Sequence, residues 1–227
     1  MNIEAIIPTA GLGRRFKAKS PKALVRLQGQ PIVVHTLKIF EKSSWIDGII
    51  LVAPRKYLPA FREIVYRYHF HKVKKVIAGG HTRSKSVKNG LKAIDADTDL
   101  IVVHDGVRPL LSQEILAKAI KLGKRFGAVV TAVPVKSTIK KVNKKMRVVQ
   151  ETLNRDELWE IQTPQVFKKG ILVKAYNTVK NLNPTDDAML VEQLGVKVKV
   201  LEGDYKNIKI TTPEDLRIAE IFLKGSK

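Results

Sequence analysis

The sequence predicts an α/β fold: a mostly parallel sheet with helices on both faces and a β-hairpin arm. Over residues 3–133, short apolar runs typical of buried strands alternate with segments of helical periodicity. This alternation is the pattern of a parallel sheet covered on both faces. The chain has 227 residues, a length at which one α/β domain is common, and no repeat or low-complexity linker divides it. We therefore predict a single domain over residues 1–227.

The first part of the chain carries the alternation most clearly. Residues 3–7 form an apolar run that predicts a buried strand. Pro31 suits the first position of a helix, and the apolar residues that follow it recur at helical spacing up to Phe40. Thr82 and Ser112 are residue types that cap helices through the side-chain oxygen. The remaining elements predicted here are an extended piece at 23–27, strands at 49–53, 74–78, 100–103 and 128–133, and helices at 55–70, 82–94 and from 112 to the glycine at 127.

Residues 136–153 interrupt this rhythm. They are rich in lysine and β-branched residues, with a turn signal at 143–145, and they predict a hairpin that extends from the body. A hairpin alone is marginally stable in water, so we expect this one to pack on something, for example a second subunit.

The last third of the chain is predicted to return to the core. Thr185 is expected to cap a helix with Asp186 and Asp187 in its first turn, where acids suit the helix dipole. Thr212 and Pro213 mark the start of a final helix. The other predicted elements are a return to the core at 155–167, a helix at 169–180 and strands at 197–201 and 208–210.

Composition limits the function classes. The chain holds 42 Lys and Arg against 21 Asp and Glu, a net charge of +21, which favours polyanionic partners. The basic residues are spread along the chain, and aromatic residues are only 6%, with none interleaving a basic patch. The chain has no cysteine, so disulfides and thiolate metal sites are excluded. No apolar run is long enough to span a membrane and no signal peptide is visible, so we expect a soluble cytoplasmic protein.

The loop after the first strand is the first candidate for a ligand site. Small residues, Thr9-Ala10-Gly11-Leu12-Gly13, let backbone N–H groups approach an anion. Cationic side chains follow, and they could offset the charge of a phosphate. The loop lacks the third glycine of a dinucleotide fingerprint, since Phe16 stands there, and it lacks the P-loop pattern. On its own it fits a phosphate site or an ordinary turn. The cations are Arg14, Arg15, Lys17, Lys19 and Lys22.

Two further loops follow predicted strands, at Gly79-Gly80 and at His104-Asp105-Gly106. Ligands of open parallel sheets bind beyond the carboxyl ends of the strands. We therefore expect these loops and the loop at Gly11 to face one crevice.

Several segments together closely resemble the 2-C-methyl-D-erythritol 4-phosphate cytidylyltransferase family. The resemblance covers nearly the whole chain in the right order. The segments are residues 8–15 with Pro21-Lys22, Gly79-Gly80 with Arg83 and Ser86-Val87, residues 104–109, Asn154-Arg155 with Leu158-Trp159, residues 162–165, Thr185-Asp186 and residues 207–209.

The resemblance implies a Rossmann-like nucleotidyltransferase fold, and a homodimer held by an arm at residues 136–155. It also implies CTP as a substrate, Mg²⁺ as a cofactor and a role in non-mevalonate isoprenoid synthesis. An alkyl phosphate would attack the α-phosphorus of CTP and release pyrophosphate. Because that phosphate is already anionic, it needs no general base, and catalysis would rest on positioning and electrostatics.

The resemblance also implies roles for individual residues. Arg15 and Lys22 would stabilise the transition state, and Arg155 and Lys209 would hold the attacking phosphate, Arg155 in its own site or the partner's. Asp105 would face Mg²⁺, the ribose or the erythritol hydroxyls. The other implied contacts are Ala10, Gly11 and Gly13 to the triphosphate, Gly80, Arg83 and Ser86 to cytidine, and Thr138 to the polyol phosphate.

Three positions depart from the family pattern: His81 beside the cytosine pocket, Asn154 before the arm arginine, and Lys206 before Asn207. Two alternatives stay open. Another polyol-phosphate cytidylyltransferase, such as one acting on ribitol 5-phosphate, would share the CTP half of the site. A basic nucleic-acid-binding protein is the alternative from a different class.

Overall fold

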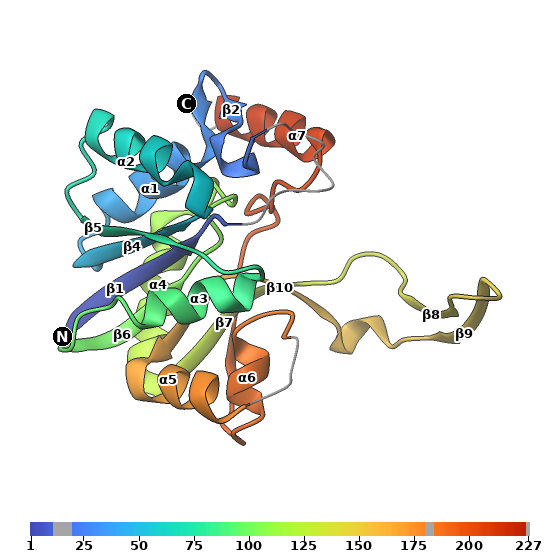
Figure 1. Ribbon diagram of the computed structural model, residues 1–227. Coiled ribbons are helices and arrows are strands. Elements are labelled where there is room, and N and C mark those ends of the chain that lie inside the picture. The colour runs from blue at the N-terminus through green and yellow to red at the C-terminus, as the bar shows by residue number, and fades with distance from the viewer. Residues whose placement is uncertain (11–19, 180–183, 226–227) are drawn as a thin grey trace.

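The computed structural model describes residues 1–10, 20–179 and 184–225. A seven-stranded sheet in the order β11-β7-β10-β6-β1-β4-β5 forms its centre (Figure 1). The strand β10 runs antiparallel to both of its neighbours, and the other neighbouring strands pair in parallel. The predicted mostly parallel sheet is therefore confirmed. The strands are β1 Asn2–Pro8, β4 Gly48–Ala53, β5 Val73–Ala78, β6 Thr98–Val103, β7 Ala128–Pro134, β10 Trp159–Lys168 and β11 Lys199–Glu202.

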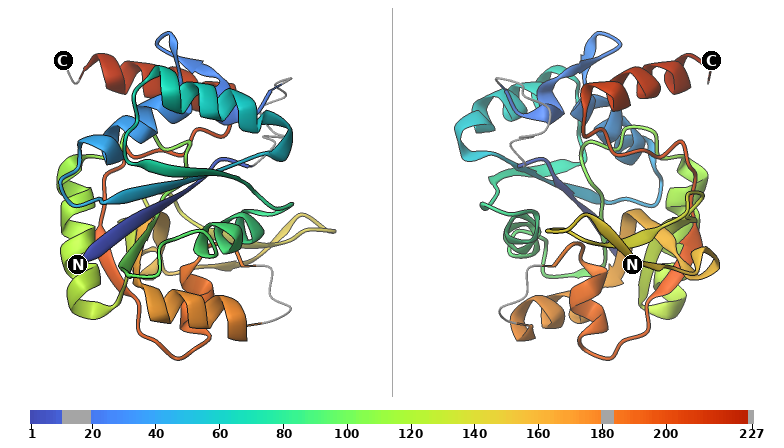
Figure 2. Two further views of the ribbon diagram at one scale, coloured as in Figure 1. Left: turned by 60° about the vertical axis from the view of Figure 1, so that its left-hand side comes forward. Right: turned by 90° about the vertical axis from the view of Figure 1, so that its right-hand side faces the viewer.

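Helices cover both faces of the sheet (Figure 2). In β1, Ile3, Ala5 and Ile7 pack into one hydrophobic core and Ile6 packs into the other. Successive strand residues point to opposite faces, so a strand that is apolar throughout needs a helical layer on each side. The first core receives α1 Ile32–Lys42, α2 Leu58–Arg67, α4 Gln113–Phe126 and α7 Pro213–Lys224, and the second receives α3 Arg83–Leu91, α5 Lys169–Thr178 and α6 Ala188–Glu192.

Three helices, α3, α4 and α7, start at the predicted capping residues. Thr82 accepts a hydrogen bond from Lys85 N, and Ser112 accepts one from Ile115 N. Thr212 and Asp215 form a capping box at the start of α7. These starts were predictable because capping depends on residues within one turn of the helix.

Several predicted boundaries are wrong. Thr185 does not begin a helix; α6 begins at Ala188, after Asp187. Pro31 precedes α1 as its cap instead of being its first residue. Residues 208–210 form no strand, although Ile210 N donates to Val107 O. Residues 55–70 and 23–27 are each split, into η3 Arg55–Tyr57 with α2, and into η2 Lys22–Leu24 with β2 Arg26–Leu27, which pairs with β3 Gln30–Pro31.

The predicted hairpin is confirmed. The strands β8 Lys140–Asn143 and β9 Val148–Thr152 pair antiparallel and extend away from the body (Figure 1). Asn143 Oδ1 accepts hydrogen bonds from Lys145 N and Met146 N, which fixes the predicted turn. The arm returns to the sheet through η4 Arg155–Glu157.

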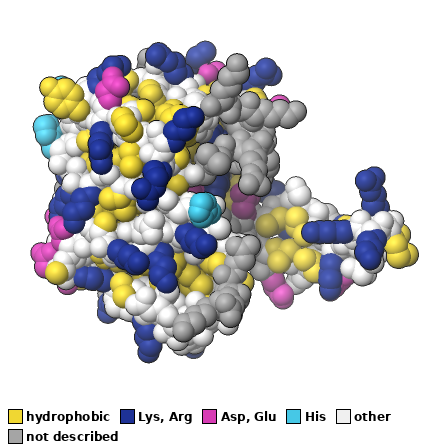
Figure 3. All heavy atoms as spheres, viewed as in Figure 1, with side chains coloured by type: hydrophobic (Ala, Val, Ile, Leu, Met, Phe, Trp, Pro, Cys, Tyr) yellow, Lys and Arg dark blue, Asp and Glu magenta, His cyan; other side chains and the backbone are white. Residues whose placement is uncertain are grey.

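Lysine and arginine side chains are scattered over the face seen in Figure 3 instead of forming one dense patch. This distribution does not resemble the continuous basic stripe that nucleic-acid-binding proteins present. Within the described part of the chain, every helix is too short or too polar to cross a membrane.

Candidate active site

The loops that follow β1, β5 and β6 pack against one another. A Cβ on Gly79 would lie 2.4 Å from Ala10 Cβ and 2.8 Å from Ser86 Oγ, so only glycine permits this approach. A Cβ on Gly106 would lie 2.4 Å from Thr9 Cγ2. The predicted convergence of these loops is therefore confirmed as far as Ala10, while Gly11, Gly13 and Arg15 lie outside the described residues.

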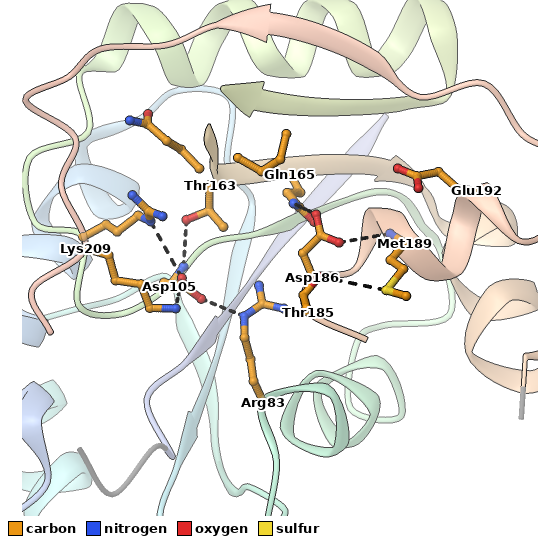
Figure 4. A pocket seen from close by; sticks show the side chains of 12 residues that line it. Arg83, Asp105, Thr163, Gln165, Thr185, Asp186, Met189, Glu192 and Lys209 are labelled. Atoms are coloured by element: carbon orange, nitrogen blue, oxygen red, sulfur yellow. Dashed lines mark hydrogen bonds and ion pairs between the residues drawn. The ribbon is translucent and has the colours of Figure 1, made fainter. Parts of the chain in front are cut away.

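Asp105 lies at the centre of this crevice and contacts three cations (Figure 4). Its Oδ1 accepts a hydrogen bond from Arg83 Nε at 2.8 Å, and its Oδ2 lies 2.8 Å from Lys209 Nζ. Arg108 Nε is 3.7 Å from Oδ2. Burial alone would raise the pKa of Asp105, but the charges of Arg83, Lys209 and Arg108 outweigh it and hold that pKa well below its usual range. The carboxyl is therefore ionised at neutral pH.

His104 and Thr163 hold the backbone at Asp105 in place. Thr163 Oγ1 accepts a hydrogen bond from Asp105 N at 3.1 Å and lies 3.1 Å from His104 Nδ1. His104 Nε2 lies 3.0 Å from the carbonyl oxygen of Arg108. A carbonyl only accepts, so we assign the proton to Nε2, and the Thr163 hydroxyl then donates to Nδ1. Burial lowers the pKa of His104 to about 4, so the ring is neutral.

Arg108 and Asn207 make contacts that the sequence did not predict. Arg108 is only 6% exposed, and its Nη1 donates to Asn207 O at 2.7 Å. Asn207 Nδ2 donates to Thr163 O and to Gln162 Oε1. These contacts tie the segment that carries Lys209 to the loop that carries Asp105. Both residues lie inside motifs of the family resemblance, at 104–109 and 207–209, which could have marked them as site residues. Their contact with each other joins residues 99 positions apart, so no local pattern could predict it.

Asp187 was predicted to lie in the first turn of a helix, but it precedes α6 and its side chain makes no capping hydrogen bond. It is fully buried and accepts a hydrogen bond from Arg83 Nη1 at 2.8 Å. Its neighbour Asp186 takes the local capping contact, since its Oδ1 accepts from Met189 N. The pairing with Arg83 crosses 104 positions of sequence, so the local pattern carried no sign of it.

A cavity of about 370 Å³ opens beside Asp105. Both cations and carboxylates line it, which suits a ligand that combines anionic groups with hydroxyls. The lining residues are Arg83, Asp105, Arg108, Ile161, Gln162, Thr163, Gln165, Thr185, Asp186, Met189, Glu192 and Lys209.

Three other predicted site residues, Gly80, Ser86 and Lys22, are not among the described residues that line this cavity. Ser86 Oγ accepts a hydrogen bond from Gly80 N at 3.1 Å and donates to Thr82 O, so these two predicted cytidine contacts form one loop structure. Lys22 is 9% exposed and starts η2, where the chain leaves the loop after β1.

Arg155 and Thr138 are not among the described residues that line the cavity. Arg155 is exposed, and its Nη1 donates to Lys136 O. It lines a second cavity of about 460 Å³ at the base of the arm, together with residues such as Trp159 and Tyr205. Thr138 is exposed on the arm. Within a single chain, the structure thus does not bring these two residues to Asp105.

The described residues offer Mg²⁺ few ligands. Across them, no group of three or more His, Asp or Glu side chains could hold a metal ion. The oxygens of Asp105 are already paired with Arg83 and Lys209. This donor set does not fit a site that binds Mg²⁺ by itself, because a bound Mg²⁺ prefers six oxygen ligands.

A family model described as 2-C-methyl-D-erythritol 4-phosphate cytidylyltransferase matches residues 3–225. The chain belongs to this family. Relatives with that name from Alkaliphilus metalliredigens and Geobacter metallireducens are 46% and 42% identical to it. Each alignment covers 99% of this chain, and they cover 94% and 98% of the two relatives.

Solved structures agree with this assignment. A 4-diphosphocytidyl-2C-methyl-D-erythritol synthase from Anaerococcus prevotii superposes with a TM-score of 0.85 at 35% identity, covering 98% of this chain and 96% of that one. The 2-C-methyl-D-erythritol 4-phosphate cytidylyltransferase from Thermus thermophilus gives a TM-score of 0.81 at 30% identity, covering 99% and 100%. The predicted family and fold class are confirmed, and the chain is an enzyme of the nucleotidyltransferase class.

Proposed function

We propose that the crevice around Asp105 is the site at which this chain performs the reaction of its family. That reaction transfers CMP from CTP to 2-C-methyl-D-erythritol 4-phosphate and releases pyrophosphate. The observation that carries the assignment to this crevice is the group of three cations around one buried carboxylate. Arg83, Arg108 and Lys209 reach Asp105 from separate segments, next to the loop after β1.

The chemistry needs fixed cations near the reacting groups because both reactants are anions. Two unit charges about 4 Å apart repel each other by about 4 kcal/mol at an effective dielectric constant of about 20. The attacking phosphate is already a nucleophile, so fixed cations contribute more than a base would. We assign Lys209 to the attacking phosphate, and Arg15 and Lys22 to the charge that develops on the α-phosphate.

The nucleotide is assigned to the loops after β1 and β5. Ala10, Gly11 and Gly13 would surround the triphosphate with backbone N–H groups. Gly80 and Ser86 shape the loop that would hold the base. Arg83 donates one N–H group to Asp105 and one to Asp187, and its remaining N–H donors would be available to cytidine. Asp105 is assigned to hydroxyl groups of the ribose or of the acceptor, since its cationic partners already occupy the directions a metal would need.

We further propose a homodimer in which the arm, residues 136–155, reaches the second protomer. The arm exposes apolar side chains that water disfavours, and an isolated hairpin is marginally stable. Arg155 and Thr138 would then contact the acceptor phosphate in the other protomer's crevice. The exposed apolar residues on the arm and at its base are Val142, Met146, Val148, Val149, Trp159 and Ile161.

Mg²⁺ is proposed to enter bound to CTP, taking its ligands from phosphate oxygens and water. Residues 1–227 would act as one domain, in the cytoplasm.

The test is a product assay with purified protein, CTP, Mg²⁺ and each of two acceptors, the methylerythritol phosphate and ribitol 5-phosphate. We expect pyrophosphate release with the first acceptor and little with the second. Faster turnover of ribitol 5-phosphate would overturn the choice of acceptor. Steeply salt-dependent binding to duplex DNA without any pyrophosphate release would instead favour the nucleic-acid alternative.

A further inference from the structure

The guanidinium of Arg83 lies between two carboxylates that come from distant parts of the chain. Its Nε donates to Asp105 Oδ1 and its Nη1 donates to Asp187 Oδ2, each at 2.8 Å. Asp105 faces the cavity, whereas Asp187 is fully buried on the other side of the arginine. Burial alone would lower the pKa of Arg83, but Asp187 and Asp105 outweigh it and raise that pKa, so the side chain stays charged.

Asp187 is itself held from two further directions. Its Oδ1 accepts a hydrogen bond from the Tyr176 hydroxyl of α5 at 2.5 Å. Gln165 Oε1, on β10, accepts hydrogen bonds from Asp187 N and Ala188 N at 3.2 Å each. Burial and the charge of Asp187 raise the pKa of Tyr176, so its hydroxyl remains the donor. A fully buried carboxylate is costly unless it is paired and hydrogen-bonded, and Arg83 and Tyr176 supply these two contacts, while Gln165 holds the backbone.

We infer that Asp187 and Tyr176 are positioning residues that fix the plane of the Arg83 guanidinium for nucleotide binding. This inference rests on the proposed function, which assigns Arg83 to cytidine. Neither Asp187 nor Tyr176 is among the described residues that line the cavity, so both act through Arg83. With carboxylates on two sides, Arg83 carries a compensated charge. It therefore presents oriented N–H donors to the uncharged part of CTP instead of attracting its phosphates.

The orientation of Arg83 should affect CTP binding more than the chemical step. Arg83 would contact the nucleotide equally in the ground state and the transition state. Loosening it therefore weakens CTP binding and leaves the chemical step nearly unchanged. The Tyr176→Phe substitution removes one hydroxyl and leaves the ring in place. We expect it to raise KM for CTP about tenfold, with kcat and KM for the acceptor changed less than about threefold.

The experiment measures KM for CTP, KM for the acceptor and kcat for wild type, Tyr176→Phe, Arg83→Ala and the double variant. Tyr68→Phe is the matched control, because Tyr68 packs on Phe70 at the end of α2. If Tyr176 acts through Arg83, its substitution adds little once Arg83 is alanine, so the two effects are not additive. A purely structural role would instead lower thermal stability and give additive losses, or no change in KM for CTP, and either result would overturn the inference.

If Tyr176→Phe does not fold, as judged by circular dichroism, Asp187→Asn is measured in the same way, and failure of both to fold shows that the pair serves the fold alone. If wild type releases no pyrophosphate from CTP, the proposed function fails, whereas normal wild-type turnover with unchanged KM in Tyr176→Phe refutes only the positioning role.

Discussion

Replacing Asp105 by asparagine should destabilise the protein, because it removes the carboxylate that pairs with a buried arginine. Among the described residues, Arg108 forms an ion pair with Asp105 and with no other carboxylate, and its side chain is only 7% exposed. Arg83 keeps Asp187 as a partner, and Lys209 is 39% exposed and can be solvated. The loss of stability therefore comes mainly from Arg108, whose buried charge is left without a partner carboxylate.

Breaking a buried ion pair from one side costs about 3–5 kcal/mol. We expect the lower end for Asp105→Asn, about 3 kcal/mol, because the asparagine oxygen still accepts hydrogen bonds. For a chain of this length that is a fall in Tm of about 6–12 °C. The substitution also removes the negative charge that holds three cations in position, so kcat/KM should fall about a hundredfold.

The pH dependence gives a second measure of the same effect. The folded pKa of Asp105 is lowered, so its contribution to stability is fully present above the unfolded value of about 4. That contribution is lost as pH falls toward the folded pKa. The difference in unfolding free energy between wild type and Asp105→Asn should therefore be constant near neutral pH and shrink below about pH 4.

The assay is thermal unfolding, monitored by circular dichroism, at neutral pH and again under acid conditions. Asp99→Asn is the control, because Asp99 is a half-exposed carboxylate that should contribute little. Adding Arg108→Met to Asp105→Asn should restore part of the lost stability, since it removes the uncompensated charge. A Tm for Asp105→Asn equal to that of the control would refute the reasoning about Arg108.

The Lys22→Ala variant should fold, by circular dichroism, yet lose nearly all pyrophosphate release; retained turnover would contradict its assignment to the α-phosphate. His104 has a pKa lowered to about 4, so the unfolded chain binds a proton before the folded one does, and stability should decline from about pH 6.5 toward pH 4. His104→Gln should flatten that decline in denaturant titrations, and an unchanged slope would argue against it. Finally, Arg155→Ala and Lys22→Ala, each inactive alone, should recover about a quarter of wild-type activity when their subunits are mixed and exchanged, because half of the dimers then hold one intact site. No recovery would place Arg155 in its own protomer's crevice.

Local sequence patterns were enough for the parallel strands and the covering helices, but they predicted the segment of β10 only as a return to the core and not as an antiparallel strand. Thr82, Ser112 and Thr212 cap helices through contacts within one turn, so the residues that decide the outcome are all visible together. The loops after the strands could also be expected at one edge, because parallel strands end on the same side of a sheet.

The wrong boundary at Thr185 shows where that reasoning stops. Asp187 is a good capping residue by type, yet it is drawn into the core by Arg83 and Tyr176. The free energy of pairing a buried charge exceeds that of one helix cap, so the long-range contact decides. The segment at 208–210 is a similar case, since its apolar residues meet the Val107 loop instead of a neighbouring strand.

The order of residues along the chain was enough to show which residue types could handle phosphate and which strands they follow, because strand and helix periods and capping act over a few residues. Which charges meet became visible only in the folded molecule. Arg83 is 22 positions from Asp105 and 104 from Asp187, and Arg108 is 99 from Asn207. Such pairings depend on how the loops stack at the sheet edge, and a local sequence pattern does not show contacts between residues so far apart.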